Sequence, residues 1–213
     1  SQEKYYFSQG YEEVSKLEKV RIKSLLDVYE GRLNTNYLPE SKKKRNIQEY
    51  SGLSSSWHQN RKNKKYINVL NRNAVNYIQN YRHAPKNTVM WTTFKPAANK
   101  YENRRMKANC RWNGRISCSE CTRPCGVNFV SCNARATNRY ADRTTLIYLC
   151  NIFPVPPVVQ YLSQGTTAEF DANLYALAQL MQWIWRSAIR RGEAVSLYLP
   201  SARMRKLLLD WLG

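Results

Sequence analysis

The most constraining feature of this sequence is an alternation, in its last third, of short apolar runs with longer segments of helical periodicity. Residues 146–150 form a continuous apolar run, which is compatible with a buried strand, although periodicity alone also allows a helix. Apolar residues alternate with polar ones over residues 195–199, which predicts a second strand. Each is followed by apolar residues at helical spacing, in residues 166–191 and 201–212. Because strands that alternate with helices usually pair in parallel, the sequence predicts an α/β fold with a mainly parallel sheet and flanking helices.

Capping signals predict where these two helices begin and end. Residues 166–169 have the composition of a capping box and Gly192 is a helix stop, so the longer helix is expected to lie between them. Ser201 is expected to cap the last helix. The inner face of that last helix is predicted to consist of Met204, Leu207, Leu208 and Trp211.

Two more helices are predicted in the first third of the chain. Apolar residues recur at near-helical spacing over residues 12–30, up to Gly31, and over residues 67–81, before Pro85. The intervening residues 32–65 are rich in Asn, Ser and Lys and poor in aliphatic side chains. This composition predicts a long loop or basic arm.

Two further strands complete the expected organisation. Residues 88–94 are β-branched and aromatic, and residues 129–132 are a second short candidate. We therefore expect a basic helical and arm region at residues 1–86 and an α/β domain at residues 87–213, with a cysteine-rich insertion at about 107–132.

The charge of the chain is strongly positive and unevenly distributed. Its 213 residues include 34 Lys and Arg against 15 Asp and Glu, a formal net charge of +19. Residues 1–150 carry 28 basic and 11 acidic residues, whereas residues 151–213 carry 6 and 4. Such a field concentrates polyanions, of which nucleic acid is the commonest. No apolar run approaches the roughly 18 residues that span a bilayer, so we expect an intracellular protein without a membrane partner.

The candidate nucleic-acid-binding residues lie in a stretch with many cations and few acids. No acidic residue occurs between Glu49 and Glu102, and Trp57 and several tyrosines are interleaved with the cations. Cations can follow phosphates while aromatic rings stack on unpaired bases. A solvated basic face without a ligand is the alternative interpretation. The candidates are Lys42, Lys43, Lys44, Arg45, Trp57, Arg61, Lys62, Lys64 and Lys65.

Closely spaced cysteines predict a structural zinc knuckle. Two thiolates separated by two residues can bind one tetrahedral zinc ion, and a further pair completes the shell. The expected ligands are Cys110, Cys118, Cys121 and Cys125, with Cys132 as a substitute for either end member. Disulfides and free thiols remain alternatives, although disulfides are uncommon inside cells.

One segment near the C-terminus resembles a helicase motif. Gln182, Arg186 and Arg190 are spaced at i, i+4 and i+8, which would place them on one side of a continuous helix. The stretch is similar to the Q-x-x-G-R-x-x-R motif in the second RecA-like domain of superfamily 2 helicases, with Trp185 where that family has glycine. Residues 88–213 as a whole resemble C-terminal segments of helicase-like proteins of phages and mobile elements.

The resemblance implies roles for particular residues. Arg186 and Arg190, with Gln182 before them, would reach the γ-phosphate of an ATP bound on a neighbouring domain, as arginine fingers do. The segment of the family that contacts the nucleic-acid backbone corresponds here to Asn133, Arg135, Thr137 and Asn138. The fold implied is RecA-like.

The chain lacks the rest of an ATPase site. It contains neither a G-x-x-x-x-G-K-[ST] phosphate loop nor a D-E-x-[DH] motif for magnesium. ATP and Mg²⁺ would therefore have to be bound by a further N-terminal domain or by an ATPase partner. The alternative function is a non-enzymatic, zinc-knuckle RNA-binding protein, such as a ribosome-like assembly component.

Overall fold

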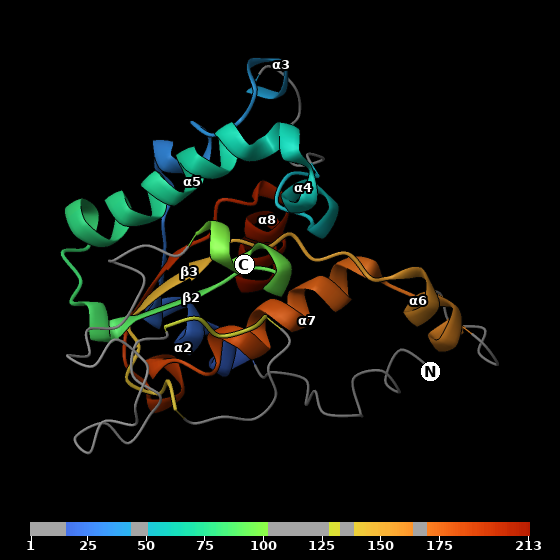
Figure 1. Ribbon diagram of the computed structural model, residues 1–213. Coiled ribbons are helices and arrows are strands. Elements are labelled where there is room, and N and C mark those ends of the chain that lie inside the picture. The colour runs from blue at the N-terminus through green and yellow to red at the C-terminus, as the bar shows by residue number, and fades with distance from the viewer. Residues whose placement is uncertain (1–15, 44–50, 102–127, 133–138, 164–169) are drawn as a thin grey trace, which may run out of the picture.

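A four-stranded parallel sheet forms the centre of the protein. The computed structural model describes residues 16–43, 51–101, 128–132, 139–163 and 170–213 (Figure 1). The strands are β1 (Leu26–Val28), β2 (Val89–Thr92), β3 (Thr145–Tyr148) and β4 (Val195–Tyr198), in the order β1-β4-β3-β2. All of the pairs are parallel, which confirms the predicted sheet type.

Helices cover both faces of the sheet (Figure 1). One face packs against α2 (Lys16–Leu25), α7 (Ala172–Ile184) and α8 (Ala202–Leu212). The other face packs against α5 (Lys64–Asn76) and the π-helix η4 (Tyr77–Tyr81) that continues it. Side chains alternate accordingly, since Leu146 and Tyr148 of β3 join the first core and Ile147 joins the second.

The remaining described elements are short. They are the helices α3 (Glu40–Lys43), α4 (Ser55–Gln59) and α6 (Pro156–Ser163) and the 3₁₀ turns η1 (Arg32–Asn34), η3 (Arg61–Asn63), η5 (Lys86–Thr88), η6 (Lys95–Lys100) and η7 (Ala188–Arg191). An isolated parallel bridge between Phe129 and Trp91 extends the sheet beyond β2. In the part of the chain that the structure describes, no helix is long and apolar enough to cross a bilayer.

The first predicted helix is shorter than expected. Residues 12–30 were expected to be helical, but α2 ends at Leu25 and the chain continues as β1. Leu26 lies opposite Val195 of β4, and the Tyr29 amide donates to the Leu197 carbonyl at 2.9 Å. Pairing with β4 overrides the local helical periodicity here. One sheet therefore contains β1, which precedes the domain boundary expected at residue 86, and β2, β3 and β4, which follow it.

The described part of the expected arm is a folded layer. Leu33, Tyr37, Leu38 and Leu53 are all buried in the core beneath α5. The prediction of a loop or arm over residues 32–65 is therefore wrong for these positions, because scattered apolar residues anchor the short helices to the sheet.

The ends of the C-terminal helices agree only in part with their capping signals. The Ser201 hydroxyl accepts a hydrogen bond from the Met204 amide, so the predicted cap of α8 is confirmed. Helix α7 instead begins at Ala172 and is capped by Asp171, whose carboxylate accepts from the Asn173 and Leu174 backbone amides at 2.7 and 3.0 Å. The expected capping box at residues 166–169 lies outside the described residues.

Candidate nucleic-acid interface

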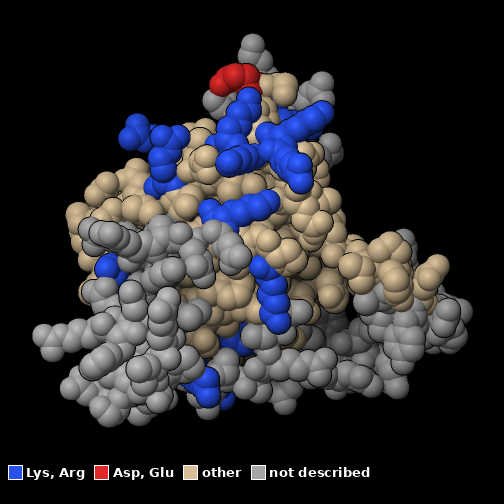
Figure 2. Space-filling view, in the orientation of Figure 1, with Lys and Arg blue, Asp and Glu red and all other residues tan. Residues whose placement is uncertain are grey.

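Exposed cations gather on the outer side of the layer that contains α4, η3 and α5. Residues 51–101 include no Asp or Glu. Figure 2 shows Lys and Arg side chains clustered over this part of the molecule, with acidic atoms only at its upper margin. We call this cluster the α5 basic surface; it consists of Arg32, Arg61, Lys62, Lys64, Lys65 and Arg72, all of them exposed.

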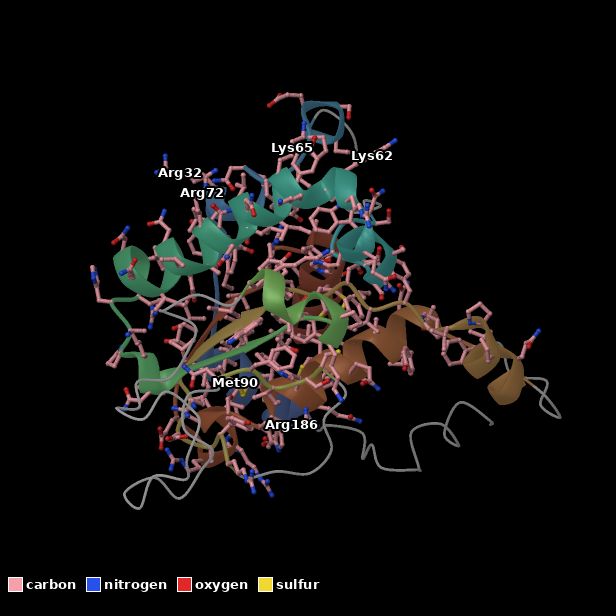
Figure 3. All side chains as sticks on the ribbon, viewed as in Figure 1. Arg32, Lys62, Lys65, Arg72, Met90 and Arg186 are labelled. Carbon is pink, nitrogen blue, oxygen red and sulfur yellow. The ribbon has the colours of Figure 1, made fainter. Side chains whose placement is uncertain are left out.

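Local structure aligns these cations along α5. Lys65 and Arg72 are seven residues apart, which is two helical turns, so they project to the same side about 10 Å apart. The side-chain amide Nδ2 of Asn73 donates to the Leu33 carbonyl at 3.0 Å and holds η1 against α5. Arg32 consequently lies beside Arg72, while Lys62 and Lys65 lie toward the start of α5 (Figure 3).

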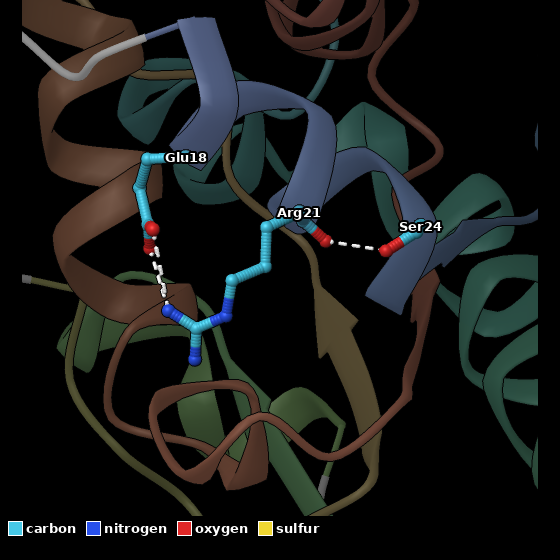
Figure 4. Close-up of polar contacts among 3 residues, drawn as sticks. All are labelled: Glu18, Arg21 and Ser24. Carbon is cyan, nitrogen blue, oxygen red and sulfur yellow. Dashed lines mark hydrogen bonds and ion pairs between the residues drawn. The ribbon is translucent and has the colours of Figure 1, made fainter.

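The cations of the α5 basic surface lack ion-pair partners in the part of the chain that the structure describes. The opposite helical layer differs, because Arg21 of α2 bonds to Glu18 at 2.9 Å (Figure 4) and Lys206 of α8 pairs with Asp210. Ion pairs among the described residues therefore do not reduce the positive field of the α5 basic surface.

The aromatic residues near these cations are mostly committed to packing. Trp57 is half-buried, with its ring edge-on to Tyr37 and His58 at 6.4 and 5.1 Å. The Lys65 ammonium lies over the Tyr66 ring at 5.0 Å. Tyr81 differs from them, because 53% of its surface is exposed.

A buried histidine fixes α4 to the sheet. The His58 Nε2 lies 3.0 Å from the Leu149 carbonyl, which can only accept, so Nε2 carries the proton. The Nδ1 atom then accepts from the Tyr101 hydroxyl at 3.2 Å. Burial lowers the pKa of His58 to about 4, so the ring is neutral at physiological pH. These bonds hold α4, and with it the cations of η3, at the carboxyl end of β3.

The helicase-like motif lies on the other side of the sheet from α5 (Figure 3). Helix α7 ends at Ile184, and Ser187 caps the separate turn η7. The expectation that Gln182, Arg186 and Arg190 share one side of a continuous helix is therefore wrong. Gln182 is exposed on α7, and Arg190 is exposed on η7.

Arg186 occupies the bend between α7 and η7. Its Nε and Nη1 atoms are buried and have no hydrogen-bond partner among the described residues. Desolvation lowers the pKa of the guanidinium. Buried guanidinium nitrogens without a hydrogen-bond partner are unfavourable, which makes the partly buried Arg186 a candidate anion ligand.

Comparison with known proteins identifies the domain. Residues 20–212 match the family described as the YonV C-terminal Rossmann-like domain. The chain belongs to this family. It is 32% identical over 209 residues to the SPbeta prophage-derived uncharacterized protein YonV of Bacillus subtilis strain 168, a match that covers 98% of this chain and 43% of that protein. The chain thus spans less than half the length of this relative. No solved structure matches it.

Several predicted site residues of this Rossmann-like domain lie outside the described residues. They are Lys44, Arg45, the candidate zinc ligands Cys110, Cys118, Cys121 and Cys125, and the candidate strand contacts Asn133, Arg135, Thr137 and Asn138. Lys42 lies in α3 and is half-buried, and the side chain of Lys43 is not described. Within the described ranges no cluster of three or more metal-ligating side chains occurs.

Sequence reasoning missed two members of the α5 basic surface. Arg32 and Arg72 are isolated cations outside the basic runs. The spacing of Arg72 from Lys65 could have revealed it, because seven residues correspond to two turns of the predicted helix. Arg32 carries no such signal, since the contact between Asn73 and Leu33 brings it there.

The neutral, buried state of His58 predicts an acid-sensitive fold. Its pKa of about 4 in the folded chain lies below the usual 6.5, so the unfolded chain binds this proton first as the pH falls. Its contribution to stability is therefore complete above pH 6.5 and declines toward pH 4, by about 3 kcal/mol over that interval. Urea unfolding across this pH range measures the effect.

His58→Gln should flatten this part of the pH profile, and His83→Gln, at an exposed histidine, is the matched control. Equal pH dependence in the wild type and His58→Gln would contradict the buried, neutral assignment.

Proposed function

We propose that this domain binds nucleic acid through the α5 basic surface. The observation that carries the proposal is the row of exposed cations without an ion pair among the described residues, on a layer whose residues 51–101 include no Asp or Glu. Cations fixed along a helix neutralise phosphates and release condensed counterions, which supplies most of the affinity for a polyanion. Anchoring of α4 by His58 and of η1 by Asn73 supports the proposal, because it orders the cations before the ligand arrives.

We further propose that the domain acts in a helicase-type, ATP-dependent protein, with Arg186 as a phosphate ligand. The specific support is the pair of buried guanidinium nitrogens without a partner among the described residues. Their position in the bend after α7 suits a residue whose partner is a phosphate supplied from outside the domain. ATP and Mg²⁺ would be bound by another domain or subunit, because this chain has no phosphate loop. Gln182 and Arg190 would be accessory to this site.

Removing three cations from the α5 basic surface should weaken binding and its salt dependence together. The variant combines Lys62→Gln, Lys65→Gln and Arg72→Gln. Its slope of log K against log salt should be less negative than that of the wild type by about 2 to 3, since each phosphate contact contributes about −0.7 to −0.9. Fluorescence anisotropy with labelled oligonucleotides at several salt concentrations measures this slope.

The matched control removes the same charge from the opposite layer, through Lys16→Gln, Lys23→Gln and Lys206→Gln, which are exposed positions on α2 and α8. Equal losses in the two triple variants would show that net charge alone drives binding and would contradict a specific surface.

Replacing Arg186 by an apolar residue should separate stability from anion binding. Arg186→Met removes two buried guanidinium nitrogens that have no hydrogen-bond partner among the described residues, so its melting temperature should equal or exceed that of the wild type. Inorganic pyrophosphate should stabilise the wild type and the α5 triple variant but not Arg186→Met, as thermal unfolding would show.

A lower melting temperature for Arg186→Met, together with an unchanged response to pyrophosphate, would assign Arg186 a structural role. A wild-type protein that binds RNA and does not respond to pyrophosphate would favour the non-enzymatic RNA-binding alternative.

A further inference from the structure

A column of tyrosine rings runs from the sheet to the surface near the end of α5. Tyr198 of β4 is stacked on Tyr77, with ring centroids 5.3 Å apart and planes inclined by 26°. Tyr77 is stacked in turn on Tyr81, at 5.6 Å and 18°. Tyr198 and Tyr77 are fully buried, whereas Tyr81 is 53% exposed. The column therefore ends in a half-exposed ring that is stacked on a buried neighbour.

Surrounding contacts hold Tyr81 in one orientation. Tyr29 packs edge-on against Tyr81 and Tyr77, with centroids 4.8 and 5.4 Å apart. The Arg82 amide donates to the Tyr77 carbonyl at 2.9 Å, and its guanidinium pairs with Asp27 of β1 at 3.1 Å. These contacts hold the Tyr81 ring and the residue that follows it. A ring ordered in advance loses little conformational entropy when a further ring stacks on it.

We propose that Tyr81 is a stacking site for an unpaired base of a single-stranded nucleic acid. The inference rests on the proposed binding of nucleic acid to the α5 basic surface and specifies the class of ligand. A base inside a duplex has both faces covered by its neighbours, so only an unpaired base can extend the tyrosine column.

The position of Tyr81 suits a strand that follows the cations. Tyr81 ends η4, the direct continuation of α5, and its neighbour Tyr29 precedes Arg32 by three residues. A strand neutralised by Arg72 and Arg32 would therefore reach Tyr81 with its next bases. A π-helical turn such as η4 is also rare and is often found at functional sites.

The first test compares single-stranded with duplex ligands. Tyr81→Leu keeps an apolar side chain but removes the aromatic face, so its affinity for oligothymidylate should fall by about 5- to 100-fold. Its affinity for a blunt duplex should change by less than about twofold, because phosphate contacts alone bind the duplex. Tyr81→Phe should bind both ligands as the wild type does. The matched control is Tyr66→Leu, because the Tyr66 ring on α5 is covered by the Lys65 ammonium. This variant should change the affinities for the two ligands equally.

A second readout does not depend on affinity. Oligothymidylate with 5-iodouracil should cross-link to Tyr81 on irradiation, and peptide mass spectrometry should find the adduct there in the wild type.

The outcomes separate this proposal from the one on which it rests. Wild-type affinity of Tyr81→Leu for oligothymidylate, or an adduct confined to another aromatic residue, would overturn the stacking site while leaving the α5 basic surface intact. Failure of the wild type to bind either ligand would overturn the proposed function itself.

Discussion

The architecture depends on parallel pairing of short strands that are buried on both faces. β2, β3 and β4 are each buried along their whole length, and their side chains alternate between the two cores. Parallel strands of this kind need helices on both sides to exclude water. The sheet therefore requires both helical layers. The outer face of each layer takes no part in covering the sheet.

The two outer faces differ in their electrostatics. On α2 and α8, cations such as Arg21 and Lys206 have carboxylate neighbours within their own helices. The six cations of the α5 basic surface have no such neighbour among the described residues, and the short elements beside α5 are held by buried polar groups such as His58 and Asn73. Charge repulsion within the α5 basic surface works against stability, and burial beneath it offsets that repulsion.

The sequence predicted strands at residues 88–94, 146–150 and 195–199 because the first is β-branched and aromatic, the second is continuously apolar and the third alternates apolar with polar residues. It failed at β1, where the pairing partner Val195 is far away in the chain, and in residues 32–65, where isolated residues such as Leu33 and Leu53 form the core. The basic runs revealed most of the α5 basic surface. The tyrosine column could not be predicted, since Tyr198 and Tyr81 meet Tyr77 only through tertiary packing.

The most direct test of the central claim is lysine footprinting, in which acetylation by a reactive ester is mapped by mass spectrometry with and without an oligonucleotide. The proposed interface predicts protection of Lys62, Lys64 and Lys65, with unchanged modification of Lys16 and Lys23 on α2. Protection confined to the α2 lysines, or equal protection of both layers, would contradict it.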